Sequence, residues 1–467
     1  MFNLRALKNH DYIITICIGI LAVLSLMLIY STTINATTAE GGAGTFSKQL
    51  FFFIIGSLIY FALSTFDLSW LRNRKLIGVF FAATLLSLIY VKLFTPEVAN
   101  TNRWINVFGF NIQPAEYAKI TIVLTTAALF GLKEDEIVKE GINLEKNDSA
   151  TIDNSLKTRI NNTFRSNYKY LISIISITAV SLLIFIQPAF GNTVIITFIW
   201  LSLMFAISSK QEQIAALVIP VILIPLFMWN VWGMQDIFNN IYAGLFIIFV
   251  ITIIINYLSK TRYYLVFAAI LIGLSLRPAI LTVWDTEVIS DYQKQRIETY
   301  FQTPENDPLD AGYQVRQSKI AVGSGQFTGR GYLQGTQSTL QVLPFAHTDF
   351  IFAALAEQFG FIGSLLLLGV YTTIIYRIIR AGLTTQDEFT FIISIGIISL
   401  LLLNIFINIG MNLGKLPVTG VPLPLVSYGG SSVLVNMIAL GLIQSINTTI
   451  TSKDISESFA PNTSPWR

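Results

Sequence analysis

One carboxylate in the chain lies where a polar segment meets a largely apolar one. Asp349 occurs in the sequence His347-Thr348-Asp349-Phe350, and a largely apolar stretch follows it. Partial desolvation at such a boundary makes a carboxylate a stronger proton acceptor, which is what general-base catalysis requires. Asp is also a preferred helix N-cap residue, so a capping role is an equally good interpretation and is compatible with the first.

Glu116 and Lys119 are a second candidate pair. They follow Pro114 at positions i and i+3, where the sequence predicts the start of a helix. This spacing favours an ion pair on one helix face, which is the structural interpretation. The functional interpretation is a polar cluster that faces a cavity between helices.

Three further cations have residue types that suit phosphate binding. Arg103, beside Trp104, is either an interfacial anchor or a bidentate clamp for a phosphate or pyrophosphate. Lys319 and Arg330 lie in a glycine-rich segment and allow the same interpretation. Other ionisable residues near apolar stretches are Lys92, Arg277 and Glu357, of which the first two are interpreted as snorkelling or structurally paired.

Several familiar chemistries are absent from the sequence. It has no G-x-x-x-x-G-K-[ST] loop, no dinucleotide-binding fingerprint and no H-E-x-x-H motif. The single Cys17 excludes an intramolecular disulfide and a Cys-based zinc site. His347 is interpreted as a polar neighbour of Asp349, since no serine nucleophile lies in a suitable elbow.

The composition determines what must position these residues. Lys and Arg number 30 and Asp and Glu 27, so 57 of 467 residues are charged, which is 12 %. Soluble domains carry about 25 %, and 53 % of this chain is hydrophobic. A cytosolic enzyme and a secreted domain are therefore excluded, and a net charge of +3 gives no reason to expect nucleic acid as a partner. The composition indicates an all-α polytopic membrane protein.

Twelve apolar stretches are long enough to be transmembrane helices. They are 12–30, 50–66, 76–94, 116–132, 170–187, 192–207, 214–229, 237–258, 263–283, 350–376, 389–413 and 426–450. With both termini in the cytoplasm, the short outer loops carry only Lys48, Arg103 and Lys415, whereas basic residues gather in the inner segments. The positive-inside rule favours this orientation.

Two long connections differ in character. Segment 133–169 is polar and charge-balanced, and is expected to be a solvated cytoplasmic loop. Segment 284–349 is the large extracytoplasmic loop, which contains glycines but also aromatic and apolar residues that predict order. Segment 416–432 is rich in Pro and Gly, and is expected to line a cavity or to be a re-entrant packing element.

Several motifs resemble those of the SEDS family, the RodA/FtsW/SpoVE group. The run from Pro417 to Ser432, PVTGVPLPLVSYGGSS, resembles the family signature, and its Pro-Leu-Pro-Leu form is closer to RodA. The run from Gln113 to Lys119 resembles the family's Gln-Pro-x-Glu-x-x-Lys. Outer-loop motifs follow in the family's order: DYQKQR from Asp291, Gly312-Tyr313, QSKIA from Gln317, Gly335-Thr336-Gln337 and HTDFIF from His347.

The resemblance implies a peptidoglycan glycosyltransferase that polymerises lipid II at the outer face of the bacterial cytoplasmic membrane. It implies a role in cell elongation and shape, beside a class B penicillin-binding transpeptidase and other membrane proteins of the elongation complex. Asp349 matches the acidic residue thought to be catalytic, Glu116 and Lys119 match a polar pair lining the central cavity, and Arg103 matches the family's Arg-Trp. His347, Ser427 and Tyr428 lie in the matched motifs and are predicted to contact substrate.

The chain also departs from the family pattern. Family members usually have ten spans, so 237–283 is interpreted as an inserted helix pair within a single domain of residues 1–467. The family's usual Asp is Ala189 here, its usual Gly is Asp310, and Lys415 replaces an apolar residue. Phe345 and Ala346 replace the family's Glu-Arg before His347. These changes touch the active face and predict altered activity or partner choice.

The mechanism expected from these residues is glycosyl transfer with Asp349 as base. Arg103, Lys119, Lys319 and Arg330 are expected near the departing diphosphate, and a divalent cation, Mg or Mn, is expected to share that charge. Two alternatives remain open: a flippase or transporter for a lipid-linked precursor, and a non-catalytic scaffold that activates a transpeptidase. No repeated segment, as many transporters have, links the two halves of the chain.

Overall fold

The computed structural model describes residues 10–35, 43–66, 68–95, 103–107, 110–132, 152–207, 311–385 and 387–458. The chain forms two compact units, Met1–Leu203 with Gln295–Arg467, and Met204–Lys294. All described residues except 204–207 belong to the first unit, which therefore contains every described candidate residue.

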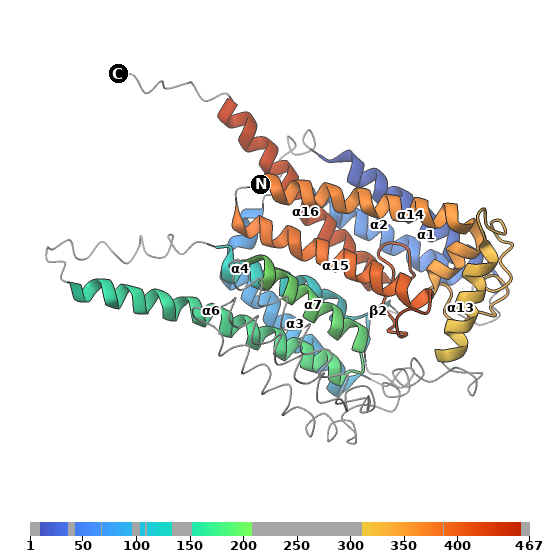
Figure 1. Cartoon of the computed structure of the whole chain (residues 1–467), viewed down its shortest axis with the longest axis horizontal. Helices are drawn as coiled ribbons and strands as arrows, with labels where there is room; N and C mark the ends of the chain where they lie inside the picture. The colour runs from blue at the N-terminus through green and yellow to red at the C-terminus, as the bar shows by residue number, and fades with distance from the viewer. Residues whose placement is uncertain are drawn as a thin grey trace, which may run out of the picture. The chain divides into compact units, whose positions relative to one another are not determined.

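The described part of the first unit is a bundle of long helices with one short hairpin (Figure 1). Its N-terminal half comprises α1 (Tyr12–Thr33), α2 (Ala43–Thr65), the 3-10 helix η2 (Leu68–Arg72), α3 (Arg74–Phe94), α4 (Pro114–Phe130), α6 (Ile152–Ile186) and α7 (Phe190–Ile207). Antiparallel strands β1 (Ile105–Val107) and β2 (Phe110–Ile112) pair with Ile105 opposite Ile112. Its C-terminal half comprises α13 (Ala311–Gly325), α14 (Ile351–Thr384), α15 (Glu388–Asn412) and α16 (Gly430–Ser458).

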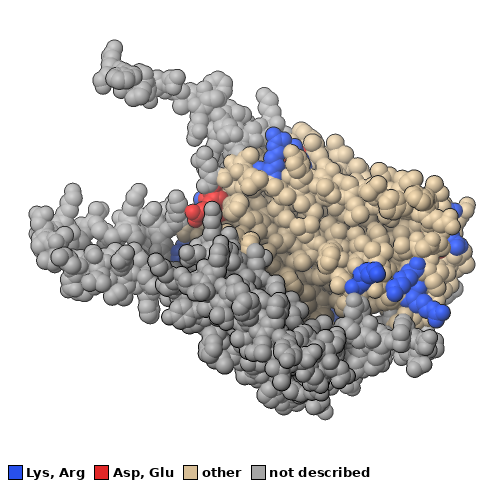
Figure 2. Space-filling model, in the orientation of Figure 1, with Lys and Arg blue, Asp and Glu red and all other residues tan. Residues whose placement is uncertain are grey.

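The outer faces of these helices suit a lipid environment. Eight described helices are long and apolar enough to cross a membrane, namely α1, α2, α3, α6, α7, α14, α15 and α16. On α1, exposed Ile13, Ile16, Ile20 and Val23 recur at helical spacing. Figure 2 shows that the visible described surface is almost uncharged between its two ends. The protein is therefore a multi-pass membrane protein, as the composition predicts.

Nine of the twelve expected spans coincide with described helices, within a few residues at most ends: α1, α2, α3, α4, α6, α7, α14, α15 and α16. The spans expected at 214–229, 237–258 and 263–283 lie outside the described residues, so twelve helices and the inserted pair 237–283 stay predictions. Segment 133–169 differs from the expected loop because α6 begins at Ile152. Residues 152–169 contain neither Gly nor Pro, so the helix of the apolar span continues through them.

The segment after α13 packs into a break in α14. Gly360 adopts φ 67° and ψ −161°, which interrupts the helix, and a Cβ there would overlap main-chain atoms of residues 327 and 329. Main-chain hydrogen bonds join the two segments: Phe361 N to Gln326 O (2.8 Å), Ile362 N to Phe327 O (3.1 Å), Arg330 N to Glu357 O (2.9 Å) and Gly331 N to Gln358 O (3.0 Å). The expected order of this part of the outer loop is therefore present, because the loop satisfies the backbone of a broken helix.

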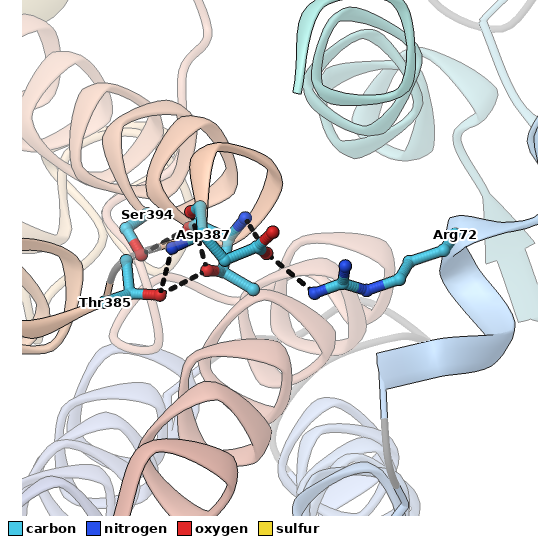
Figure 3. A network of polar contacts seen from close by, with 5 residues as sticks. Arg72, Thr385, Asp387 and Ser394 are labelled. Atoms are coloured by element: carbon cyan, nitrogen blue, oxygen red, sulfur yellow. Dashed lines mark hydrogen bonds and ion pairs between the residues drawn. The ribbon is translucent and has the colours of Figure 1, made fainter. Parts of the chain in front are cut away.

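Ion pairs link helices at the opposite end of α14. Asp387 is the N-cap residue of α15, and its Oδ2 accepts hydrogen bonds from Thr390 N (3.1 Å) and Arg72 Nη2 (2.8 Å), as Figure 3 shows for the arginine. Asp11 Oδ2 accepts from Arg377 Nε (2.6 Å). We call this region, defined by Asp11, Arg72, Arg377 and Asp387, the Asp387 end. The Arg72, Asp387 and Arg377 side chains are partly exposed, whereas Asp11 is buried.

Candidate active site

Asp349 is half-buried. Hydrogen bonds to three consecutive main-chain carbonyls hold the segment that carries it. Each accepts hydrogen bonds from the C-terminal part of the chain: His347 O from Tyr428 N (2.9 Å), Thr348 O from Ser427 Oγ (2.6 Å), and Asp349 O from Nδ2 of Asn408 and of Asn412 (3.0 Å each). We call residues 347–349, with Asn408, Asn412 and Ser427, the Asp349 end. Fixing the main chain at three successive residues restricts where the carboxylate can lie.

The N-cap interpretation of Asp349 is wrong. The N-cap position of α14 is Phe350, and no side-chain hydrogen bond is made from that position. Thr348 N and Phe350 N both donate to Phe345 O, at 3.1 and 3.2 Å. This turn extends the irregular backbone by one residue, so that the helix begins at Ile351 and Asp349 lies before the cap.

His347 and Tyr428 lie side by side next to this segment. Their ring centroids are 5.8 Å apart with planes at 54°, and both residues are half-buried. Burial lowers the pKa of His347, so its imidazole is neutral at pH 7. The predicted arrangement of His347 as a polar neighbour is consistent with this geometry, and contact of His347 or Tyr428 with substrate stays a prediction.

The Pro- and Gly-rich segment 416–432 is packed into the bundle. Val421, Leu423 and Val426 are fully buried. Side chains from four helices donate to its carbonyls: Ser25 Oγ to Val426 O (2.8 Å), Gln49 Nε2 to Ser427 O (3.3 Å), Tyr371 OH to Pro424 O (2.6 Å) and Asn408 Nδ2 to Val421 O (2.8 Å). Protein groups thus satisfy the irregular backbone, as a re-entrant packing element requires, and a cavity stays a prediction.

Glu116 and Lys119 form the ion pair that their spacing predicts. Lys119 Nζ lies 2.7 Å from Glu116 Oε1, and both side chains are almost completely buried. Ala189, where the resembled family carries Asp, lies in an apolar cluster with Ala115 and Ala118. The departure from the family therefore places an apolar side chain close to the helix that bears the pair.

Arg103 contacts main-chain carbonyls in the structure. Its Nε donates to Gln187 O (3.0 Å) and its Nη2 to Pro188 O. These contacts join the segment before the hairpin to the turn between α6 and α7. Arg103 therefore has a structural contact, whereas its roles as an interfacial anchor and as a clamp on a diphosphate stay predictions.

Lys319 and Arg330 are exposed cations, and Lys319 lies near the Asp349 end. Lys319 follows Ser318 on α13, and the Ser318 Oγ donates to Asn412 O (2.7 Å). The Lys319 side chain lies against Gly414. Arg330 Nη1 donates to Thr336 Oγ1 (2.9 Å).

The other departures from the family pattern lie around the same region. Lys415 is exposed, Phe345 is exposed with φ 54°, and Ala346 packs into a small apolar cluster with Phe350. Asp310 lies outside the described residues. The structure therefore places three of these changes close to Asp349.

Sequence reasoning gave no role to several buried polar residues that organise this region. The Glu357 carboxylate is fully buried and accepts four hydrogen bonds: from Thr336 Oγ1 (3.2 Å), Gln337 N (2.8 Å), Ser338 N (2.9 Å) and Ser338 Oγ (2.7 Å). Asn408 and Asn412 were also missed. The signal for them is an i, i+4 spacing of asparagines in an otherwise apolar helix, since buried amides need partners.

The described residues offer no group of three or more His, Cys, Asp and Glu side chains that could hold a metal ion. The expected divalent cation therefore has no described ligand set, and it stays a prediction.

The chain is similar to known proteins over nearly its whole length. The profile of the FtsW/RodA/SpoVE family of cell cycle proteins matches residues 11–242 and 224–452. The chain is 30 % identical over 465 residues to peptidoglycan glycosyltransferase RodA of Treponema pallidum, covering 95 % of this chain and 99 % of that one. It is 44 % identical over 206 residues to peptidoglycan glycosyltransferase MrdB of Escherichia coli K12, covering 44 % and 52 %.

Solved structures show the same fold. A structure of a peptidoglycan synthase complex that coordinates polymerization and crosslinking aligns with a TM-score of 0.60 and 20 % identity, covering 94 % of this chain and 98 % of that one. The rod shape determining protein RodA of Thermus thermophilus aligns with a TM-score of 0.52 and 19 % identity, covering 94 % and 96 %.

Proposed function

The chain belongs to the FtsW/RodA/SpoVE family of cell cycle proteins, and from this premise we propose that it is a peptidoglycan glycosyltransferase. Its substrate is lipid II, an undecaprenyl-diphosphate-linked disaccharide peptide, which it polymerises into glycan strands during cell elongation. The observation that carries the proposal is the fixed segment 347–349, which holds an acidic residue of the matched motif beside a buried, organised loop.

The proposed reaction uses Asp349 as general base. Its carboxylate accepts the proton of a sugar hydroxyl while that oxygen bonds to the anomeric carbon of the second substrate. The bond from that carbon to the lipid diphosphate breaks, and the diphosphate leaves with the electron pair. The three clamped carbonyls support this role, because a base must be held within hydrogen-bond reach of the proton it accepts.

The departing diphosphate needs positive charge nearby. Lys319 and Arg330 are assigned this role first, because both are exposed and Lys319 lies close to the Asp349 end. Lys119 and Arg103 are assigned to the same charge, although each already has a protein partner. When the diphosphate binds, Lys119 and Arg103 must either keep their protein partners and contact it as well, or exchange those partners for it.

The proposed orientation puts the Asp349 end outside the cytoplasmic membrane and the Asp387 end in the cytoplasm. Arg72, Arg74, Lys75, Arg377 and Arg380 all lie near the Asp387 end, which is the excess expected on the cytoplasmic side. In this orientation, Asp349 faces the compartment in which the cell wall is made.

The proposed partners are a class B penicillin-binding transpeptidase and other membrane proteins of the elongation complex. Support comes from the fold shared with a synthase complex that coordinates polymerization and crosslinking. Measuring polymerisation with and without the cognate transpeptidase tests this partner, because an activating partner raises the rate.

Polymerisation of lipid II by the purified protein tests the reaction and the base. We expect Asp349→Asn to lower the rate by about 10²- to 10⁴-fold, the usual contribution of a general base. Asp387→Asn is the matched control, since it makes the same change at the opposite end and should polymerise at the parent rate. An Asp349→Asn protein that makes glycan chains at the parent rate would rule out Asp349 as the base.

A non-catalytic scaffold is the second candidate. The observation that favours it is Ala189, which puts apolar packing where the family usually has a carboxylate. Normal rod shape in cells that carry only the Asp349→Asn protein would support the scaffold and contradict the enzymatic role.

A further inference from the structure

We propose that Asn412, together with Asn408, positions Asp349 for proton transfer, an inference that rests on the proposed role of Asp349 as base. Both asparagines lie on α15 and are fully buried. Each donates its Nδ2 hydrogen to the main-chain carbonyl of Asp349, at 3.0 Å. They touch the main chain of the base, so they are positioning residues.

Asn412 also caps the helix that Asp349 precedes. Its Oδ1 accepts a hydrogen bond from Ala353 N (3.0 Å), in the first turn of α14. One carboxamide therefore spans the main chain from residue 349 to residue 353. The N-cap residue Phe350 makes no capping hydrogen bond, so α15 supplies from outside what a local Asp cap would supply. This arrangement assigns a capping function at α14 to the Asn412 side chain.

Three helices meet at Asn412, which makes the position rigid. Its main-chain oxygen accepts from Ser318 Oγ of α13 (2.7 Å), and its Nδ2 also donates to Asn408 O (2.8 Å). Asn408 in turn donates to Val421 O (2.8 Å) of segment 416–432. A displacement of residues 347–349 would thus break hydrogen bonds to α15 and to segment 416–432 together, and α15 is itself held by α13 through Ser318.

Small displacements matter for this chemistry. A misplacement of about 1 Å can lower a rate by about 10²-fold even when substrate binding is unchanged. Loss of the Asn412 amide should therefore lower kcat far more than it changes KM for lipid II. General destabilisation would instead lower the folded fraction and leave kcat per folded molecule unchanged.

The test compares Asn412→Ala, Asn412→Asp and a matched control, Asn404→Ala. Asn404 lies about two helical turns from Asn412 on α15, is also buried, and its Oδ1 has no partner among the described residues. We expect Asn412→Ala to lower kcat by about 10²-fold with KM within about threefold, and Asn404→Ala to keep kcat within about threefold. Each rate is divided by the folded fraction from thermal unfolding in detergent.

The pH profile adds a readout that a structural role would not move. Asn412→Asp retains the acceptor for Ala353 N but adds a carboxylate beside Asp349, so the acid limb of kcat/KM should move to higher pH. The inference is overturned if both Asn412 variants keep the parent kcat and acid limb although Asp349→Asn lowers the rate as expected. If Asp349→Asn is fully active, the proposed base and this inference fail together. Asn408→Ala provides the same kcat test if the Asn412 variants do not fold.

Discussion

The two ends of the bundle are held by different kinds of polar contact. At the Asp349 end, buried amides and hydroxyls donate to main-chain carbonyls, as Asn412 and Ser427 do. At the Asp387 end, long charged side chains pair with each other, and the Arg72 and Asp387 side chains are 44 % and 26 % exposed. Buried hydrogen bonds to the main chain fix atomic positions, whereas exposed ion pairs are weak and screened by salt.

This difference indicates a division of labour. The Asp349 end lies where the proposed reaction needs a carboxylate held in one place. Its contacts use neutral donors, so they leave the nearby cations available for an anionic substrate. The Asp387 end joins helices through charges that also satisfy the positive-inside rule. Variants of buried and of exposed polar residues test whether the two kinds of contact also contribute differently to stability.

The largest expected effect is at Glu357, which holds residues 336–338 against α14. Glu357→Ala leaves several buried donors without an acceptor, so we expect about 3 kcal/mol less stability in thermal unfolding. Glu388→Ala is the matched control at the other end. Glu388 is exposed in the first turn of α15, and its loss should cost at most about 1 kcal/mol.

Equal losses for Glu357→Ala and Glu388→Ala would contradict the larger contribution expected from a buried, hydrogen-bonded carboxylate than from an exposed one. We expect polymerisation by the Glu357→Ala protein to fall as well, because the loop it anchors follows α13 and leads to Asp349. The Glu388→Ala protein should polymerise lipid II at the parent rate.

A smaller effect is expected at Asp387, where capping and ion pairing can be separated. Asp387→Ala removes the cap on Thr390 N and the pair with Arg72, for an expected loss of about 1–2 kcal/mol. Asp387→Asn retains a capping side chain and loses only the pair, so it should cost at most about 0.5 kcal/mol.

Salt distinguishes the two contributions at Asp387. In 1 M NaCl the difference between the parent and Asp387→Asn should shrink, because the Debye length falls to about 3 Å. The cost of Asp387→Ala should remain mostly unchanged, since a helix cap depends less on screening. A loss from Asp387→Asn that equals that of Asp387→Ala would show that the ion pair is the stronger contact.

The sequence predicts the helices better than it predicts their contacts. A helix that faces lipid must be apolar along its length, so α1, α3 and α15 could be located within a few residues. Hydropathy does not predict the early start of α6 at Ile152, because the first turns of this helix are polar and only helix propensity favours them. The break at Gly360 depends on a loop segment some 30 residues earlier, which local patterns do not reveal.

The site shows the same limit. Asp349 could be chosen from its place at an apolar boundary, and the Glu116–Lys119 pair from its spacing. The cap on α14 could not be predicted, because it comes from Asn412, 59 residues after the nitrogen it binds. Contacts between distant segments thus hold the main chain that carries the Asp349 carboxylate.

The smallest expected effect is on pH dependence, through the two histidines of the chain. Burial lowers the pKa of His347 below its usual 6.5, so below that pH the unfolded chain binds more protons than the folded one. The resulting stability is present above pH 6.5 and is lost as the pH falls toward the folded pKa. His347→Gln should therefore reduce the loss of thermal stability between pH 7.5 and 5.5. His10, at the Asp387 end, is also lowered by burial, but Asp11 opposes that change, so His10→Gln should have a smaller effect. Identical pH dependence in the parent and His347→Gln would contradict a buried neutral imidazole beside Asp349.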